Sequence, residues 1–485
     1  MKKIIIFLVS IITMTACLDE ALNVQPVSET YTNKYWKSSG DVRAALNSIY
    51  ADMQKSFTTN YGANYMDWYE MRSDNFIGSV SIGNPQNGII NRNQLTAYSS
   101  PADWNLWYKS ISTANYAIHF VPGIEAIPEV TRNNFLAEAY FLRAFCYFNL
   151  IRIWGDVPYM DQPVITLSDL TWPTQTSKQV VMDSLILKDL HLSDSLTDVT
   201  QTDMFRFSPG VLYSLYTDVA MWNHDYATAL TYSQKLYTLN KYTLVSTANY
   251  GTIFSTAITT ENIWSLKWSY VNNNNNALYL NYVYTAPPYL IPSKPVKDLW
   301  ATNAWRKDMR RGQMLDSNYV YPTTHVTSLP YQAAIKKWGA VTITNEIPLI
   351  MYRLADIILL RAEALNKTGS YQLALDELNK IRVRAGLPKR LLTDYATAPD
   401  QTYAIESDIL QDRQFELIGE GRRWFDLMRT GRAVTTMNNF FDSYLKLYGV
   451  TNYVPFDPAK TWQLYWPVFQ NNIVINKNLI QIGNY

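Results

Sequence analysis

The sequence predicts a mostly α-helical fold, in which tetratricopeptide-like helical hairpins form a scaffold that long insertions of loops and short strands interrupt. Several stretches repeat apolar residues at the 3.6-residue period of an amphipathic helix. Two pairs of small residues have the spacing of closely packed antiparallel helices. Long stretches rich in Asn, Gly, Pro, Thr and aromatic residues lack this period and lie between the helical parts.

The first helix is expected from Ser38 to Phe57. Ser38 and Asp41 have the spacing of a capping box, which satisfies free N–H groups at a helix start. The apolar stripe that follows is Val42, Ala45, Leu46, Ile49, Tyr50 and Met53.

Two more amphipathic helices are expected before residue 155. The first carries Trp104, Trp107, Tyr108, Ile111 and Ile118 on one stripe. The second carries Ala139, Leu142, Cys146, Leu150 and Ile153, and the sequence GDVP at 155–158 ends it.

Two later hairpins resemble each other. Thr217 and Ala229 are twelve residues apart, as are Ala362 and Ala374, with one small residue for each helix. This spacing is typical of tetratricopeptide hairpins, but two ordinary amphipathic hairpins would show it as well. The copies are 145 residues apart, so they are not consecutive repeats.

Three insertions separate the helical parts, at residues 58–100, 246–345 and 386–402. Irregular segments of this length inside a folded body usually carry function or are disordered. The strand-like run at 262–268 predicts that the second insertion is ordered.

The N-terminus predicts export. Lys2 and Lys3 precede an apolar core at 4–12, and small and polar residues lead to Ala16-Cys17, as in a secretory signal. The segment resembles a bacterial lipoprotein signal, with 1–16 removed and Cys17 acylated. An ordinary signal with an incidental cysteine is the alternative. We expect the mature chain, 17–485, to form a single domain.

Composition excludes several classes of protein. Removing Lys2 and Lys3 lowers the 42 basic residues to 40, against 41 acidic residues, so the mature formal charge is −1. A nearly neutral chain without a basic run has no electrostatic footprint for nucleic acid. No later segment approaches 18 consecutive apolar residues, so we expect no transmembrane helix. Cys146 is predicted to be a small core residue.

Catalytic and metal-binding motifs are missing from the sequence. The four histidines are widely separated, and no HExxH, G-x-S-x-G, phosphate-loop or EF-hand pattern occurs. Asp412 and Glu416 lie among arginines at helical spacing, so we interpret them as surface or scaffold ion pairs rather than as a glycosidase pair. We therefore predict no enzymatic activity, no cofactor and no metal site.

An ordered set of motifs carries a family resemblance. The C-terminal half contains YRLADIILLRAEA at 352–364, LNKIRVRAGL at 378–387, Glu416-Leu417, EGRRWFDL at 420–427 and NLIQIGNY at 478–485. The N-terminal half adds Tyr35-Trp36, EMRSDN at 70–75, Arg143-Ala144 and GDVP at 155–158. Over essentially the whole mature chain, this set resembles the SusD/RagB family of nutrient-binding outer-membrane lipoproteins.

The resemblance implies a function. Members are lipid-anchored at the cell outer membrane, and a TonB-dependent barrel of the SusC type is their partner. Most members bind an oligosaccharide on a surface built from loops and pass it to the barrel. A peptide or another nutrient as ligand, or a purely structural lid or adaptor role, remains an alternative.

The arginines and the tryptophan of the motif at 420–427 are interpreted as scaffold. Arg422, Arg423 and Trp424 follow a glycine after a helix, which suits ion pairing and stacking between helices.

The predicted ligand site lies on the first two insertions. Sugars present flat apolar faces ringed by hydroxyls, so a receptor needs exposed aromatic rings beside amide or carboxylate groups. The candidate residues are Trp68, Asp74, Asn75, Phe76, Asn91, Arg92, Trp268, Tyr270, Tyr279, Tyr282, Tyr284 and Tyr289. Tyr282 and Tyr284 rank highest, because residues two apart on a strand share one face. For the tryptophans of the second insertion, the alternative is that Trp264 and Trp268 are buried in a strand.

Overall fold

The structure is a computed structural model of the chain. It describes residues 35–485 except 63, 79–84, 199, 257, 270, 272–275, 277–289, 303–304, 306, 317–333, 339–345 and 447–451. The predicted signal and Cys17 therefore lie outside the described residues.

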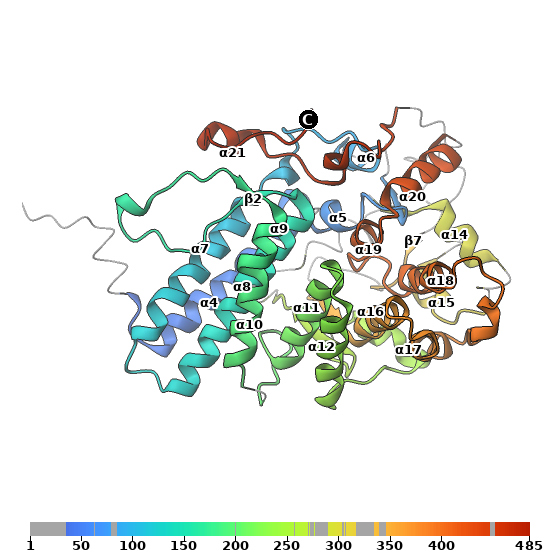
Figure 1. The fold of residues 1–485 in the computed structure, drawn as a ribbon, viewed down its shortest axis with the longest axis horizontal. Coiled ribbons are helices and arrows are strands. Elements are labelled where there is room, and N and C mark those ends of the chain that lie inside the picture. Colours follow the sequence, from blue (N-terminus) through green and yellow to red (C-terminus); the bar gives the residue numbers. More distant parts are fainter. Residues whose placement is uncertain are drawn as a thin grey trace, which may run out of the picture.

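Helices dominate the described chain, as predicted. Figure 1 shows helices α4, α7, α8 and α10 on the left, the C-terminal helices α16–α20 on the right, and α11 and α12 between them. The helices are α4 (Ser39–Gly62), α5 (Asn64–Tyr69), α6 (Pro85–Asn91), α7 (Asn105–Phe120), α8 (Glu129–Trp154), α9 (Lys178–Val181), α10 (Leu187–Leu196), α11 (Pro209–Trp222), α12 (Tyr226–Thr238), α14 (Lys294–Ala301), α15 (Arg311–Met314), α16 (Leu354–Lys367), α17 (Tyr371–Arg384), α18 (Gln401–Glu416), α19 (Arg423–Arg429), α20 (Ala433–Phe440) and α21 (Gln470–Ile475).

The start of α4 confirms the predicted capping box. The Asp41 side chain accepts a hydrogen bond from the Ser38 backbone at 2.8 Å, and the Asp41 N–H donates to Ser38 Oγ at 3.3 Å. The predicted apolar stripe is buried. The helix continues to Gly62, so the first insertion begins later than residue 58. This extension keeps Phe57 packed against Tyr65 and Trp68 from α5.

Helices α7, α8 and α10 pack side by side, and α4 covers α7. From Ala137 to Trp154, every residue of α8 except Tyr140 is buried, so this helix is the centre of the N-terminal half. The helix ends at Gly155, where φ is 79° and only glycine is unstrained. Cys146 is a buried core residue, as predicted.

The two predicted hairpins form and lie next to each other. Helix α11 packs on α12 and α16 on α17, and Thr217, Ala229, Ala362 and Ala374 are fully buried where these helices approach. Helix α12 also packs on α16, so hairpins far apart in sequence stack in space.

The described strands form two-stranded antiparallel pairs, of which β1–β5 and β4–β8 join segments far apart in the sequence. The pairs are β1 (Phe76–Gly78) with β5 (Leu290–Pro292), β2 (Val157–Pro158) with β3 (Gln175–Thr176), β4 (Asn262–Leu266) with β8 (Leu349–Arg353), and β6 (Leu315–Asp316) with β7 (Ala334–Ile335). Strand β4 confirms the predicted strand in the second insertion. It is fully buried against β8.

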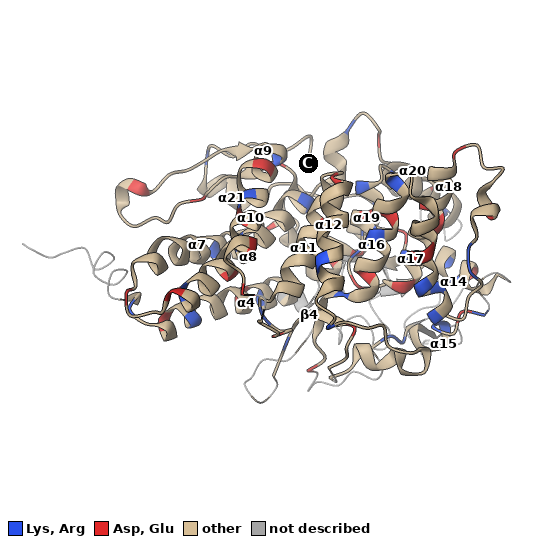
Figure 2. Cartoon of the chain, turned by 60° about the horizontal axis from the view of Figure 1, so that its bottom comes forward, with Lys and Arg blue, Asp and Glu red and all other residues tan. Residues whose placement is uncertain are grey.

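The buried hydrophobic side chains form one continuous cluster from Val42 to Leu479. Within the described ranges, no helix has both the length and the hydropathy needed to cross a bilayer. The same ranges contain no cluster of three His, Cys, Asp or Glu side chains suited to a metal ion. Figure 2 shows acidic and basic residues interspersed over helices α16–α20.

Candidate ligand-binding site

The first two insertions meet at one short ladder. In the β1–β5 pair, Phe76 lies opposite Pro292, and Gly78 lies opposite Leu290. Residues 79–84 follow β1, and residues 277–289 precede β5. Both segments therefore start from the same end of this ladder. We call the β1–β5 ladder the stem. The two halves of the predicted ligand site are joined there, although 212 residues separate Gly78 from Leu290.

Two further segments begin beside the stem. Strand β7 packs on β5, and residues 317–333 connect β6 to β7. Helix α6 packs on β1, and at its end Arg92 accepts a backbone hydrogen bond from Val454 at 2.9 Å. The Arg92 side chain donates to Asn452 Oδ1 at 2.8 Å, next to residues 447–451. The described frame thus gathers the ends of four segments at one place.

A buried polar cluster fixes the stem to the helical scaffold. Asp74 forms a two-point ion pair with Arg423, at 2.8 and 2.9 Å. Gln414, on α18, donates to Asn75 Oδ1 at 3.0 Å. The Ser293 N–H, directly after β5, donates to the Asn75 carbonyl at 2.8 Å. The segment before β1 is therefore held by the C-terminal helices and by the second insertion.

Burial and pairing oppose each other at the two acids of this cluster. Burial alone would raise the pKa of Asp74, but the Arg423 guanidinium outweighs it and holds the pKa below its usual value. Glu70 accepts hydrogen bonds from Asn75 at 2.9 Å and from the Gly421 N–H at 2.6 Å. Burial raises the pKa of Glu70 to about 7, because the lost hydration outweighs these two bonds.

Three predicted aromatic contacts are core residues instead. Trp68, Phe76 and Trp268 are each 1% exposed, so the prediction that they form open stacking surfaces is wrong. Trp68 packs edge-on against Trp154, and its ring N–H donates to the Pro101 carbonyl at 2.6 Å. Such packing satisfies a tryptophan completely and leaves no face for a ligand.

Three predicted polar contacts hold the fold. Asp74 and Asn75 are the buried stem residues described above. Asn91 is 4% exposed, and its amide donates to the carbonyls of Met71 and Phe76 at 3.1 Å each. The side chains of Asp74, Asn75 and Asn91 thus bond to other parts of the protein instead of facing a ligand.

Six predicted residues keep their status as predictions. Arg92 is half-buried at the edge of the stem, beside Asn452. The other five lie outside the described residues; they are Tyr270, Tyr279, Tyr282, Tyr284 and Tyr289.

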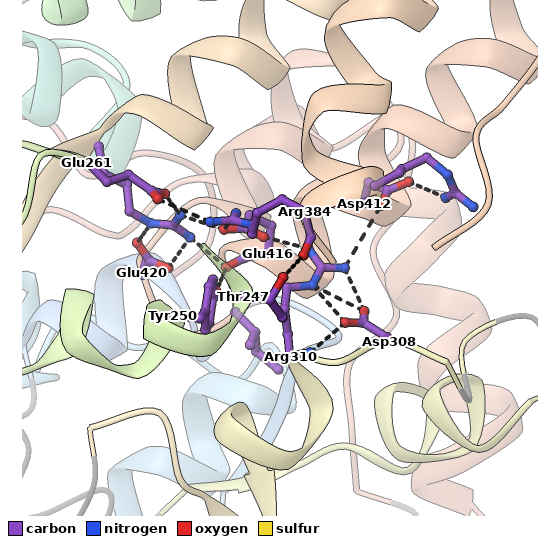
Figure 3. A network of polar contacts seen from close by, with 12 residues as sticks. Thr247, Tyr250, Glu261, Asp308, Arg310, Arg384, Asp412, Glu416 and Glu420 are labelled. Atoms are coloured by element: carbon purple, nitrogen blue, oxygen red, sulfur yellow. Dashed lines mark hydrogen bonds and ion pairs between the residues drawn. The ribbon is translucent and has the colours of Figure 1, made fainter. Parts of the chain in front are cut away.

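A second buried polar cluster, the ion network, joins residues of the second insertion to the C-terminal part of the chain (Figure 3). Glu416 at the end of α18 faces Arg310, Arg353 and Arg384, each at 2.5 Å. Five cations face five carboxylates, and none of these side chains is more than 7% exposed; they are Arg310, Lys337, Arg353, Arg382, Arg384, Glu261, Asp308, Asp412, Glu416 and Glu420.

The ion network decides how Asp412 and Glu416 should be understood. Both are fully buried and paired with arginines, so they are scaffold residues rather than surface pairs. Burial would raise the pKa of Glu416, but Arg384, Arg353 and Arg310 hold it well below its usual value. A carboxylate surrounded in this way has no free proton to donate and no access to substrate.

The scaffold role predicted for Arg422 and Trp424 is confirmed. Arg422 pairs with Asp356 at 2.9 Å and lies over the Tyr352 ring, 4.7 Å from its centre. Trp424 is buried, and the Arg72 guanidinium lies 4.6 Å from its ring centre.

The sequence analysis did not identify an exposed tryptophan. Trp172 is 49% exposed, on the loop between β2 and β3 that no prediction singled out. A tryptophan in a short irregular segment gives no periodic signal, so only the structure separates it from the buried tryptophans.

The fold and the stem define a helical scaffold that presents grouped loop segments at one place. Residues 298–485 match the family model described as "SusD family", and residues 22–216 match the model described as "Starch-binding associating with outer membrane". The chain belongs to the SusD-like family.

Individual relatives agree along the chain. A SusD-like protein of Formosa agariphila is 27% identical, covering 98% of this chain and 97% of the relative. The crystal structure of a SusD superfamily protein from Bacteroides vulgatus has a TM-score of 0.76 at 19% identity, covering 93% of this chain and all of that chain. A solved structure named as a laminarin-binding SusD-like protein has a TM-score of 0.70 at 20% identity, with the same coverage. The similar structures establish the fold.

Proposed function

We propose that this protein is a surface lipoprotein of an outer membrane that captures a glycan on the segments grouped at the stem. The observation that carries the proposal is the β1–β5 pairing, which joins the asparagine- and tyrosine-rich segment 270–289 to the first insertion. Family membership supports it, as does the laminarin-binding relative of similar fold.

Glycan capture suits the chemistry of these segments. Tyrosine rings stack on the C–H faces of sugars, and asparagine amides donate to and accept from hydroxyls. Each contact of this kind is weak, and a protein that hands over its cargo gains from weak contacts. The proposal contains no catalytic step.

The proposal also places the protein in a transport system. Acylated Cys17 would anchor it in the outer membrane, and a TonB-dependent barrel of the SusC type would receive the glycan. The segment 18–34 would tether the folded body to the lipid. An extended chain spans about 3.3 Å for each residue, so this tether reaches roughly 55 Å.

Affinity electrophoresis against a panel of polysaccharides tests the proposal. We expect at least one neutral polysaccharide to retard the wild-type protein, and the double variant Tyr282→Ala/Tyr284→Ala to lose most of that retardation. Tyr403→Ala is the matched control, because Tyr403 is 57% exposed at the far end of α18 from Gln414. Tyr403 and Gln414 are eleven positions apart on this helix, which places Tyr403 about 16 Å along the helix axis from the residue that contacts the stem.

Three results would contradict the proposal. Retention of peptides without retardation by any glycan would indicate a peptide receptor. Unchanged uptake and unchanged co-purification with the barrel in the double variant would indicate a structural adaptor. Continuous release of product from a bound glycan would indicate a hydrolase.

A further inference from the structure

A hollow of about 220 Å³ lies between α21, the start of α7 and the loop that joins β2 to β3. It is separate from the stem residues and from the ion network. The residues that line it are Trp104, Asn105, Tyr108, Pro158, Met160, Leu170, Thr171, Trp172, Pro173, Asn472, Ile475, Asn476 and Leu479.

Hydrogen bonds hold the walls of this hollow in place. Asn476 donates to the Pro173 carbonyl at 2.8 Å, and Asn478 donates to the Trp172 carbonyl at 2.6 Å. On the opposite side, the Tyr108 hydroxyl donates to the Pro158 carbonyl at 2.7 Å. The loop that carries Trp172 is therefore tied to the C-terminal segment, and the hollow exists before any ligand binds.

The walls combine an aromatic ring with apolar and amide groups. Trp172 is the one tryptophan among the large exposed apolar side chains of the described chain, and Leu170 and Ile475 flank it at 49% and 61% exposure. Asn105 is exposed at the first turn of α7. Asn472 is 4% exposed, and its Oδ1 accepts no hydrogen bond from the described protein. No lining residue carries a charge.

Size and polarity select one class of occupant. A cavity of about 150 Å³ accommodates a benzene ring, so this hollow has room for one six-membered ring with substituents but not for two. The absence of charge among the lining residues disfavours a uronic acid or a sulfated sugar. An aliphatic side chain of a partner protein would fill the volume but would leave the buried Asn472 Oδ1 without a hydrogen bond.

We propose that this hollow is an accessory subsite for a single uncharged pyranose residue of a glycan. The apolar face of the sugar ring lies on Trp172 and between Leu170 and Ile475. The Asn105 amide binds one hydroxyl directly, and a second hydroxyl reaches Asn472 Oδ1 through a bridging water. The inference rests on the proposed glycan capture and adds a second place where the same polymer is held.

The subsite borders the first insertion. The Gln470 N–H at the start of α21 donates to the Ala97 carbonyl at 2.8 Å, so the wall of the hollow is attached to the end of that insertion. A polymer long enough to reach both the stem and the hollow would bind the second place as an intramolecular step, at a raised effective concentration.

Two measurements test the subsite. The first soaks crystals with glucose, galactose, xylose or rhamnose, with glucuronate as the charged comparison; we expect density for a neutral sugar over Trp172 and none for glucuronate. The second measures affinity electrophoresis on the polysaccharide that retards the wild type. We expect Trp172→Ala and Asn105→Ala each to weaken retention about tenfold.

Leu167→Ala is the matched control, because Leu167 is 86% exposed on the same loop and does not line the hollow. Retention unchanged in Trp172→Ala, with no sugar density, would overturn the subsite while leaving the proposed function intact. Glucuronate density equal to that of glucose would also overturn it. If Trp172→Ala no longer co-purifies with the barrel but retains glycan as the wild type does, the hollow is a protein contact instead. If no glycan retards the wild type, the proposed function fails, and the soaked crystals alone decide the subsite.

Discussion

At the scale of single residues, the ion network shows how a protein core tolerates many charges. Taking one charge out of water costs several kcal/mol, and a close partner of opposite charge with good hydrogen bonds offsets this cost. Glu416 meets three arginines, and Arg353 meets Glu261, Glu416 and Glu420. The loss of one member therefore leaves several buried charges without a partner and should destabilise the fold.

Glu416→Gln tests this sensitivity. The amide keeps the size of the side chain but leaves Arg310, Arg353 and Arg384 without their shared carboxylate. We expect the free energy of unfolding to fall by about 3–5 kcal/mol in a urea titration. Asp442→Asn is the control, because Asp442 forms an exposed pair with Lys446 at 3.3 Å. The urea midpoint of this variant should equal that of the wild type. Equal midpoints in the two variants would contradict the argument.

Glu70 gives the stem a dependence on pH. Its folded pKa of about 7 exceeds the ordinary value of 4.5, so between these values the folded protein holds a proton that the unfolded chain has lost. Stability therefore falls as the pH rises from 4.5 to 7, by up to about 1.4 kcal/mol for each pKa unit.

Urea unfolding at about pH 5 and about pH 8, in wild type and in Glu70→Gln, measures this dependence. The loss of stability on going to the higher pH should be smaller in the variant, because glutamine does not titrate. The difference between the two proteins isolates Glu70 from other buried groups. Parallel pH curves would show that Glu70 does not titrate in this range.

The sequence predicted residue roles well where neighbours in sequence determine them. Asp412 and Glu416 were predicted to form surface or scaffold ion pairs because arginines surround them, and their burial in the structure decides for the scaffold. Trp68 and Trp268 were predicted to be exposed because they lie in or near aromatic insertions. Their burial depends on distant partners such as Trp154 for Trp68, which no local pattern reveals.

At the scale of elements, long periodic helices were predictable and short strands were not. The capping box and the apolar stripe identified α4, and GDVP at 155–158 marked the end of α8. Strand β1 contains three residues, too few to show the alternation of a strand, and its partner β5 follows more than 200 residues later. The stem could therefore be found only in three dimensions.

Gly155→Ala tests the turn that ends α8. At φ 79° and ψ −114°, a side chain is strained, and a Cβ would lie 3.3 Å from the Tyr465 ring. We expect a loss of about 1–3 kcal/mol in the free energy of unfolding. Gly123→Ala is the matched control, because a Cβ there meets nothing within 4 Å. A loss of equal size in both variants would show that the backbone at Gly155 is not the cause.

At the scale of the whole molecule, the ordered motifs identified the family and the mostly helical fold. The resemblance could not supply the ligand residues, because none of its motifs extends into residues 270–289. The candidate list therefore mixed scaffold residues such as Asn75 and Asn91 with loop tyrosines. Burial and hydrogen bonding separate the two groups where the structure describes them.

Cys17→Ser tests the attachment of the whole protein to the membrane. Each buried methylene contributes about 0.8 kcal/mol, so under the proposed acylation of Cys17 the loss of its acyl chains would remove the anchor. We expect the wild type in the detergent phase of an outer-membrane extract and the variant in the aqueous phase, with glycan retardation unchanged. A variant that stays in the detergent phase would show that another part of the chain holds the membrane.

The pairing of Gly78 with Leu290 also bears on how much change the adjoining segments can accept. When the ends of a segment are held by their own hydrogen bonds, doubling its length costs only about 0.6 kcal/mol in closure entropy. Insertions and deletions between these ends leave Asp74, Asn75 and their helical partners in place. The same helical body can thus carry segments of different length and composition on one fixed base.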